Sequence, residues 1–442
     1  MSSIAQVSKA MQTVLTTVAD TAARATDFVQ RASKLTGALF TQTLVFGFLA
    51  NPNASRQELA QTAAALGLSI SPQGLDQRLT ETAADCLLEV LDAATTTVLA
   101  ADPTAIPLLA RFNGVFIQDS SLISLPSSLA HIWRGSGNQN TSPDSVARLK
   151  LSVRLDLVSG QLTGPHIDHG LTSDRKLLLQ EQALPKGGLR LADLGFFDLK
   201  VLRAIEAAGA YWLTRPQITT VMTDLEGKRL DLVSLLAAQD SPSLDKPICL
   251  GAREKLPCRL LAVRVAQEVA DQRRRRLREE AKRRGRQPNA VQLALCEWTI
   301  FVTNVPSEML SVKEALTLGR ARWQIELLFK LWKSQGQIDQ WRSAKAGAIL
   351  CELYAKLIGM VVQHWIMLVG LWAYADRSLM KAAATVRKHA LWLASALSCL
   401  SRLAEAIESI VACLASGCRI NKSKKTPHTF QLLLDLTEAA LD

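Results

Sequence analysis

The stretch from residue 115 to residue 214 constrains the fold most, because patterns typical of strands and helices alternate along it. Residues 115–117 are a short apolar run of the β type. Residues 149–158 alternate apolar and polar side chains, Ser159 and Gly160 supply a turn, and residues 161–169 return, which predicts a β-hairpin. A period of two is typical of strands. Because helix-like patterns alternate with these strands, we expect an α/β fold.

Four more elements follow the hairpin. The patterns predict a helix at residues 174–182, a strand at 189–192, a helix at 198–208 and a strand at 210–214. The expected order is therefore three strands, a helix, a strand, a helix and a strand. One acid, Asp119, lies at the end of the first strand, and Asp193 lies at the end of the fourth.

Both flanks of this region are expected to be helical, up to about residue 105 and from residue 345 onward. A capping box at Ser55 opens one N-terminal helix. Ser71, followed by a proline, fits the start of a second helix that ends near Thr82. This pair is either a DNA-contacting helix-turn-helix or an ordinary helical hairpin.

No membrane segment is expected. The most apolar run, residues 357–373, is interrupted by Gln363 and His364 and falls short of the roughly 20 residues of a membrane span. We expect a buried helix there. The first 34 residues lack the apolar centre of a secretory signal, and the eight cysteines form no C-x2-C pair. A zinc site is therefore disfavoured, and the pattern fits reduced thiols and a cytoplasmic location.

Positive charge is concentrated in two stretches. Residues 272–287 hold nine Lys and Arg and two Glu, which is +7 of the net charge of +11. Residues 419–425 add four cations without an acid. Such blocks are either solvated surface or surfaces that attract a phosphate backbone. The basic balance favours nucleic acid over acidic small molecules as the partner.

Residues 318–335, LGRARWQIELLFKLWKSQ, have the period of an amphipathic helix. At about 100° per residue, Arg322, Glu326 and Lys333 fall within about 40° of one another. They form either a surface ion-pair row, since Arg322 and Glu326 are four residues apart, or part of a site. The buried side of the helix is expected to consist of Ile325, Leu328 and Trp332.

Asp119 and Asp193 favour the interpretation as a site. Each follows an apolar strand, where an ionised carboxylate is costly unless it is paired or bound to metal. A lone Asp there commonly forms a cap or turn, but two of them with Glu326 supply the oxygen ligands that Mg²⁺ prefers. Two such ions, about 3.5–4 Å apart, activate a water or a 3′-hydroxyl in phosphoryl displacement.

These residues resemble the motifs of insertion-sequence transposases of the DDE type, in the IS-four family. Arg322-x3-Glu326-x6-Lys333 matches the third motif, Y-x2-R-x3-E-x6-K, within a typical RW-x-IE context. Asp119, followed by two serines, matches the first acid, and Asp193 in ADLGFF matches the second. The resemblance covers about residues 110–370.

The resemblance implies a ribonuclease-H-like catalytic core that is interrupted by a β-rich insertion and flanked by helical regions. The strands and helices expected above have the same order. The implied regions are a helical N-terminal DNA-binding region (1–108), the first part of the core (109–216), a β-rich insertion with the Arg-rich stretch (217–296), the second part of the core with the Glu326 helix (297–345) and a helical C-terminal region (346–442).

The resemblance also implies an activity and its site. A protein of this kind binds the inverted repeats at the ends of an insertion sequence, cleaves strands with two Mg²⁺ ions, for which Mn²⁺ substitutes, and joins the 3′-hydroxyl to target DNA. We expect a homodimer on double-stranded DNA. The implied catalytic and metal-binding residues are Asp119, Asp193 and Glu326, and the expected DNA-binding residues are Arg322, Lys333, Trp298, Arg215, Lys330 and Lys150.

Trp298 lies in the strand before the third motif, where relatives that cut through a DNA hairpin carry an aromatic residue that stacks on a flipped base. One departure from the family pattern is Gly319, which replaces the motif tyrosine. Two other functions therefore stay open. One is an inactive DNA-binding relative that represses transposition, and the other is a nuclease of the same fold.

Other acids compete for the same roles. Asp174 and Asp224 are alternatives for the second acid, since both lie near predicted strand ends or turns. His166 and His169, near Asp168, are a weaker candidate for a metal site, and turn residues are the simpler interpretation.

Overall fold

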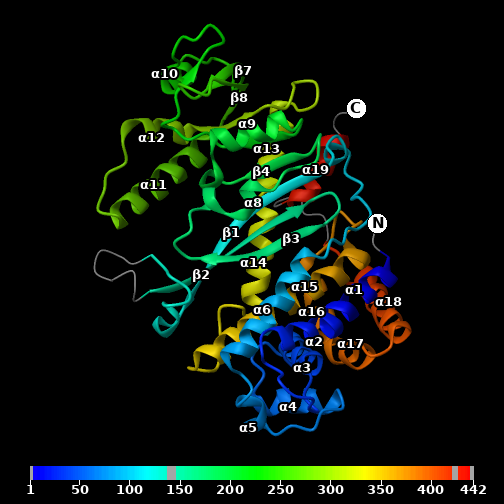
Figure 1. Cartoon of the computed structure of the whole chain (residues 1–442). Coiled ribbons are helices and arrows are strands. Elements are labelled where there is room, and N and C mark those ends of the chain that lie inside the picture. Colours follow the sequence, from blue (N-terminus) through cyan, green and yellow to red (C-terminus); the bar gives the residue numbers. More distant parts are fainter. Residues whose placement is uncertain (1–2, 137–145, 421–426, 439–442) are drawn as a thin grey trace. The chain divides into compact units, whose positions relative to one another are not determined.

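The structure is a computed structural model that describes residues 3–136, 146–420 and 427–438 (Figure 1). Its backbone contacts divide the chain into two compact units, and each unit is described by itself. Unit 1 consists of Met1–Ile106, Asp119–Thr172 and Trp323–Gln431, and unit 2 consists of Pro107–Gln118, Ser173–Arg322 and Leu432–Asp442.

Unit 1 is mostly helical. A π-helical turn, Val14–Val18, joins its first two helices, and the hairpin of β2 (Ala147–Asp156) and β3 (Leu162–His169) is its main β-structure. Its helices are α1 (Ile4–Thr13), α2 (Ala19–Ala25), α3 (Gly37–Ala50), α4 (Arg56–Ala65), α5 (Pro72–Asp76), α6 (Glu81–Thr96), α14 (Trp323–Ser334), α15 (Ala346–Leu371), α16 (Leu379–Lys388), α17 (Ala390–Ala396) and α18 (Leu400–Gly417), and α19 (Thr429–Glu438) follows them in the chain.

Helix α15 is the core helix of unit 1 and packs against α3, α6 and α18. By length and composition it is apolar enough to cross a membrane, but 94% of its most apolar window is buried inside the protein. Each of the two polar residues that interrupt the run donates one hydrogen bond inside the protein. Gln363 donates to the Ala383 carbonyl at 3.1 Å, and His364 Nε2 donates to the Gly160 carbonyl at 2.7 Å. The expectation of a buried helix is confirmed.

The N-terminal helices begin where the sequence predicts. Ser55 and Glu58 form the expected capping box of α4, and Ser71 caps α5. The expected length of the second helix is wrong, because α5 ends at Asp76 after five residues. Thr80 then accepts a hydrogen bond from the Ala83 amide and starts α6, so the cap divides the run.

The strands form one sheet in the order β3-β2-β1-β4-β5-β9-β8-β7-β6. Strands β1, β4 and β5 are parallel, whereas β2 with β3 and all neighbours from β5 to β6 are antiparallel. The expected β-rich insertion therefore extends the same sheet. The strands outside the hairpin are β1 (Val115–Leu125), β4 (Leu189–Ala192), β5 (Tyr211–Thr214), β6 (Met222–Thr223), β7 (Ser243–Leu250), β8 (Leu256–Arg264) and β9 (Trp298–Thr303).

Strand β1 is longer than the sequence predicts. The expected end near Asp119 is wrong, because apolar residues resume after the serines and Ile123 and Leu125 are buried. The parallel pairing with β4 ends at the pair Gln118 and Ala192. Asp119 therefore follows the last residue of β1 that pairs with β4, and it lies inside the strand instead of ending it.

The helices of unit 2 are mostly short. The helix expected at residues 174–182 is divided into a 3-10 turn, Asp174–Lys176, and α8. Within the insertion, a strand-like pattern at residues 218–222 predicts a strand, but the strand found there, β6, is Met222–Thr223. The α-helices are α7 (Pro107–Ala110), α8 (Leu178–Glu181), α9 (Leu199–Ala207), α10 (Leu232–Ala237), α11 (Gln267–Arg283), α12 (Ala290–Ala294) and α13 (Val312–Ala321).

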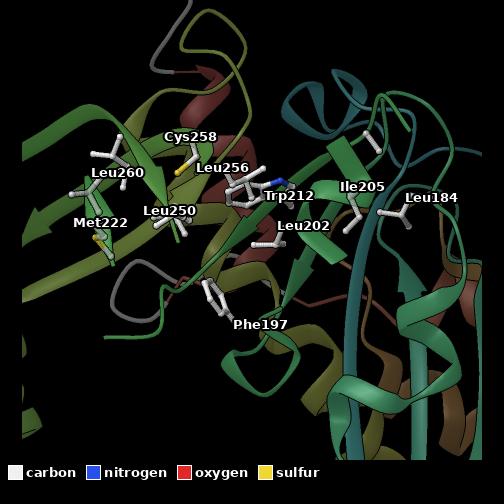
Figure 2. Packing of buried hydrophobic residues seen from close by; sticks show 13 residues of the cluster. Leu184, Phe197, Leu202, Ile205, Trp212, Met222, Leu250, Leu256, Cys258 and Leu260 are labelled. Carbon is white, nitrogen blue, oxygen red and sulfur yellow. The ribbon is translucent and has the colours of Figure 1, made fainter. Parts of the chain in front are cut away.

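The core of unit 2 forms between its strands and helix α9. Trp212 of β5 is only 1% exposed and packs among residues that include Leu202 of α9 and Leu256 of β8 (Figure 2). Truncating a side chain of this size in a core typically costs about 3–5 kcal/mol. The alternation that predicts β5 therefore also predicts its role in packing.

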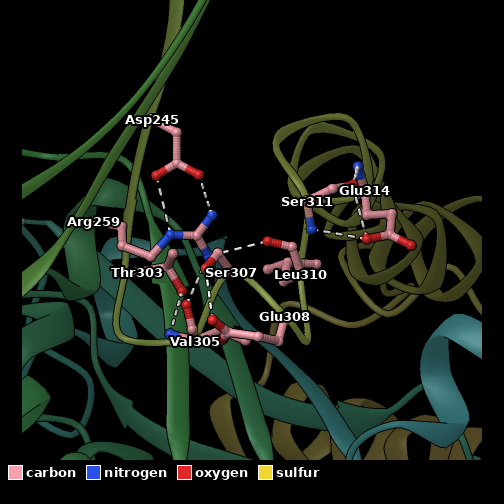
Figure 3. Close-up of polar contacts among 9 residues, drawn as sticks. All are labelled: Asp245, Arg259, Thr303, Val305, Ser307, Glu308, Leu310, Ser311 and Glu314. Atoms are coloured by element: carbon pink, nitrogen blue, oxygen red, sulfur yellow. Dashed lines mark hydrogen bonds and ion pairs between the residues drawn. The ribbon is translucent and has the colours of Figure 1, made fainter.

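Arg259 of β8 fixes the segment that leads into α13. Its guanidinium pairs with Asp245 of β7 and donates to the carbonyls of Val305 and Leu310 at 2.8 and 3.0 Å (Figure 3). Ser311 and Glu314 then form a capping box that starts α13. The start of this helix is thereby attached to the sheet of unit 2.

The single helix expected up to residue 335 is interrupted. α13 ends at Ala321 with Arg322 as its C-cap, and α14 begins at Trp323. The unit 2 segment Ser173–Arg322 ends between the two helices, and the unit 1 segment that begins at Trp323 follows it. The two helices are therefore in different units. The expected buried face of α14 is confirmed, since Ile325, Leu328 and Trp332 are at most 1% exposed.

Candidate active site

A pocket of about 500 Å³ in unit 1 brings together two of the three predicted catalytic acids. Asp119 is supplied by β1 and Glu326 by α14. The same pocket is lined by Lys330 and Lys333, which the sequence assigns to DNA binding. The complete lining is Asp119, Ser120, Ser121, Glu326, Phe329, Lys330, Lys333, Ser334, Asp339 and Gln340.

Burial of one side of α14 sets the direction of these side chains. One side of α14, which includes Ile325, Leu328 and Trp332, is buried, so Glu326, Lys330 and Lys333 remain on the accessible side. Lys333 also donates from Nζ to the Leu122 carbonyl of β1 at 3.2 Å. Ser120 donates its backbone amide to the Asp119 carboxylate at 2.8 Å. β1 therefore contributes the Asp119 carboxylate to the pocket, and α14 contributes the Glu326 carboxylate and two ammonium groups.

The donors in this pocket are carboxylates and hydroxyls. Asp119, Glu326 and the two serines supply oxygen atoms, which are the ligands that Mg²⁺ and Mn²⁺ accept. The residues present therefore fit a hard divalent cation. Within residues 3–136, 146–420 and 427–438, no three His, Cys, Asp or Glu side chains are grouped closely enough to hold a metal ion by themselves.

Asp193 lies in unit 2, at the end of β4. Its backbone caps the 3-10 turn Leu194–Phe196, and its side chain is exposed. β4 pairs with β1 in parallel up to Ala192 opposite Gln118, so Asp193 and Asp119 are the residues that follow the last pair between these two strands. Ligand sites of parallel sheets lie at the carboxyl ends of the strands, where Asp193 is found.

A second cavity of about 460 Å³ lies within unit 2, and Leu194, the residue after Asp193, is part of its lining. Arg215, which follows β5, and Trp298 of β9 both line it, and the sequence predicts both as DNA-binding residues. Its remaining walls include Leu194, Arg273, Arg276, Leu277, Leu295 and Ile300. The cavity thus combines an indole and apolar side chains with three guanidinium groups.

Trp298 is held firmly in this cavity wall. It is 6% exposed, and the Arg264 guanidinium lies over its ring at 4.8 Å from the centroid. Arg273 of α11 donates to the Trp298 carbonyl and to the Thr299 hydroxyl, both at 2.9 Å. Burial lowers the pKa of Arg273 below its usual range. Part of the Arg-rich stretch is therefore structural.

The remaining predicted DNA contacts lie elsewhere. Lys150 of β2 is 8% exposed, and its ammonium group donates to the Thr172 carbonyl at 2.5 Å. Arg322 is the partly buried C-cap of α13 in unit 2, so its expected place on one face with Glu326 is not a property of one continuous helix. Of the second basic stretch, residues 421–426 lie outside the described part of the chain.

The structure separates the two alternatives for the second acid. Asp224 follows β6, which is five strand positions from β4, or about 24 Å at ~4.8 Å per strand. Asp174 is much nearer, since its Oδ2 lies 2.7 Å from the position that a Cβ on Gly195 would take. Asp174 is therefore the stronger alternative to Asp193.

The histidines of β3 have structural surroundings. His169 Nδ1 accepts the Arg134 amide at 3.3 Å, and its ring contacts Trp133. Burial lowers the pKa of His166 and raises that of Asp168. Asp168 pairs across the hairpin with Lys150 in the β2–β3 register.

The comparison with known proteins decides the family. The family described as "Transposase DDE domain" matches residues 110–361, which is more than half of the chain. The chain belongs to this family. The matched range includes Asp119, Asp193 and Glu326.

Several transposases resemble the chain over most of its length. They include the transposase for insertion sequence element IS231F of Bacillus thuringiensis subsp. israelensis, which is 27% identical over 318 residues, 67% of this chain and 66% of the relative. The transposase for IS231D of B. thuringiensis subsp. finitimus is 26% identical over 77% of this chain and 75% of its own length. The transposase for IS1151 of Clostridium perfringens is 25% identical over 78% and 76%.

Several residues that line the two pockets were not predicted from the sequence as site residues. Ser120 and Ser121 follow Asp119 directly and were noted only as part of its motif. Asp339 and Gln340 come from the segment between α14 and α15, which has no pattern of its own. Arg273 and Arg276 belong to a charge run in which the sequence does not separate inward from outward residues.

Proposed function

We propose that this chain is a transposase that cleaves DNA at the ends of an insertion sequence and joins the freed 3′-hydroxyl to target DNA. The observation that carries the proposal is the pocket in which Asp119 and Glu326 lie with Lys330 and Lys333. This pocket falls within the segment that matches the DDE-domain family. The names of the relatives support the same conclusion.

In this proposal Asp119, Asp193 and Glu326 are the catalytic acids. They would hold two Mg²⁺ ions, or Mn²⁺ in their place, which would supply Lewis-acid activation of a water or 3′-hydroxyl and of the leaving oxygen. The carboxylates keep the reacting groups in place, and Ser120 orients the Asp119 carboxylate through its amide. No covalent bond to the protein is required.

The basic residues bind the DNA backbone. Lys330 and Lys333 neutralise phosphates at the pocket, and Arg322 and Lys150 are assigned to phosphate contacts farther along the strand. Arg215 and Trp298 line the cavity of unit 2, whose indole and guanidinium groups suit a base displaced from the helix. Exposed cations of α11 add attraction to the duplex.

We assign β1 to β5 to a ribonuclease-H-like core, on the basis of the family resemblance. The order β3-β2-β1-β4-β5, with an antiparallel hairpin followed by parallel strands, supports this assignment. The helical regions 1–108 and 346–442 and the insertion 217–296 are proposed as the flanking regions. The protein acts as a homodimer on double-stranded DNA in the bacterial cytoplasm.

Cleavage of a labelled duplex that carries the element's own ends tests this function. Wild type is expected to cut in Mg²⁺ and to be inactive in EDTA, and Asp119→Asn is expected to bind the ends without cutting them. Products joined to target DNA identify a transposase. Cleaved products that never join indicate the nuclease, and metal-independent binding without cutting by the wild type indicates the repressor.

A further inference from the structure

A buried ion pair lies beneath the segment that connects α14 to α15. Lys356 Nζ and Glu352 Oε1, one helical turn apart on α15, are 2.8 Å apart. Their side chains are 1% and 2% exposed, and Lys356 is among the largest fully buried side chains of the described chain. Removing two charges from water is costly, so this pair needs an explanation beyond packing.

The pair is attached to the connecting segment by its remaining hydrogen bonds. Lys356 Nζ donates to the carbonyls of Gln337 and Gln340 at 3.1 and 2.8 Å. Glu352 Oε2 accepts the Arg342 amide at 3.4 Å. Gln337 has a φ of 45°, a conformation that costs a non-glycine residue energy and persists only where its surroundings impose it.

The attached segment is a wall of the candidate active site. Asp339 and Gln340 line the pocket that contains Asp119 and Glu326, and Gln340 is one of the two residues whose carbonyls Lys356 binds. Ile338, which lies between Gln337 and Asp339, is fully buried and helps to fix the segment. The ion pair therefore acts on the backbone of the pocket wall, while its own charges are remote from solvent.

Stability alone does not account for this arrangement. Buried ion pairs can often be replaced by apolar residues of similar volume without loss of stability. An apolar pair would leave the Gln337 and Gln340 carbonyls and the Arg342 amide without these partners. What the charged pair adds is a fixed backbone between residues 337 and 342.

We propose that Lys356 and Glu352 are positioning residues, which hold residues 337–340 as a fixed wall of the active-site pocket and present Asp339 and Gln340 to the bound DNA strand. The inference rests on the proposed function of that pocket. Catalysis depends on such fixed geometry, because a misplacement of about 1 Å can cost a factor of about 100 in rate.

The test uses the full chain with both charges removed together, as Glu352→Met/Lys356→Met. Unlike either single substitution, this variant leaves no unpaired buried charge, so it is expected to lose less stability than either single variant. Asp376→Asn, which breaks the partly exposed ion pair with Arg419, is the control for a lost ion pair elsewhere in unit 1.

Hydrogen–deuterium exchange gives the first readout and needs no DNA. Amides of residues 337–342 are expected to exchange about tenfold faster or more in the double variant, whereas α15 and the Asp376→Asn control exchange like wild type. Unchanged exchange in this segment would overturn the proposal, whatever the protein does to DNA.

Single-turnover cleavage of the end duplex gives the second readout. The saturated rate is expected to fall by about ten- to a hundredfold. The DNA concentration at half-saturation is expected to stay near wild type, since Lys330 and Lys333 of the pocket remain. A loosened segment with an unchanged saturated rate would overturn the proposal and leave the proposed function intact. If wild type cuts nothing, the proposed function fails, and the exchange experiment still tests whether the pair holds the segment.

Discussion

The Phe301 ring of β9 fills the space beside Gly319 of α13. A Cβ at Gly319 would lie 2.3 Å from Phe301 Cζ, which is closer than real Cβ contacts allow. Phe301 is 8% exposed and so has little freedom to move away. The residue that departs from the family motif is therefore one that the packing of unit 2 requires.

This contact predicts that restoring the motif tyrosine harms the protein. Gly319→Ala is expected to lower the free energy of unfolding by about 1–3 kcal/mol, and Gly319→Tyr by more. Urea denaturation measures both. Gly417→Ala at the end of α18 is the control, because among the described residues no atom outside its own stretch of helix lies within 4 Å of its Cβ position. A Gly319→Tyr protein as stable as wild type would contradict this account.

Burial of His364 predicts a loss of stability in mild acid. Burial lowers its pKa to about 4, its hydrogen bond to the Gly160 carbonyl opposes this shift, and Arg377 adds to it. Between pH 6.5 and 4 the unfolded chain binds a proton that the native chain does not. The contribution of His364 to the free energy of unfolding is therefore full above pH 6.5 and falls by about 3 kcal/mol on acidification to pH 4.

Denaturation of His364→Asn as a function of pH tests that contribution. Its free energy of unfolding is expected to vary less than that of wild type over this interval, and His389→Gln on the partly exposed His389 is the control. The same dependence in wild type and His364→Asn would remove His364 as the cause.

The outward side of α11 predicts a particular salt dependence. Arg275, Arg278 and Lys282 are exposed, unlike Arg273, and fall on one side of the helix. Changing all three to Gln is expected to weaken DNA binding. If each contacts one phosphate, the slope of log K against log salt falls by about 2.7, or about 0.9 per contact.

The control for this measurement removes the same charge elsewhere. Lys9, Lys388 and Arg402 are exposed cations of unit 1, and their triple Gln variant is expected to keep a slope near that of wild type. Equal changes in both variants would mean that net charge alone, and not the α11 surface, controls binding.

The sequence predicts the elements of the core well where a pattern is local. β4, β9 and α9 lie within one residue of their expected bounds, because alternation and caps are local signals. β7 was not predicted, since Asp245, Lys246 and Pro247 interrupt its apolar pattern. The strand forms in the structure through its antiparallel pairing with β8. The length of β1 also depends on pairing that sequence does not display.

The site was predictable in part for the same reason. Glu326 and Lys333 share one helix, so their common face follows from helical geometry, and both line one pocket. The break at Arg322 is not visible in the apolar pattern, which continues across it. Asp339 reaches the pocket through a connection whose path is set by Lys356, a residue distant in sequence.

The role of Asp193 as the second acid is the part of the account that most needs a direct measurement. Asp193→Cys replaces a carboxylate with a thiolate, which Mn²⁺ accepts better than Mg²⁺ does. We predict that this variant cuts the end duplex in Mn²⁺ but not in Mg²⁺, while Asp174→Cys cuts in both. If Asp193→Cys cuts the duplex in Mg²⁺ at the wild-type rate, the assignment of Asp193 is contradicted. If Asp174→Cys requires Mn²⁺ for cutting, the role of the second acid passes to Asp174.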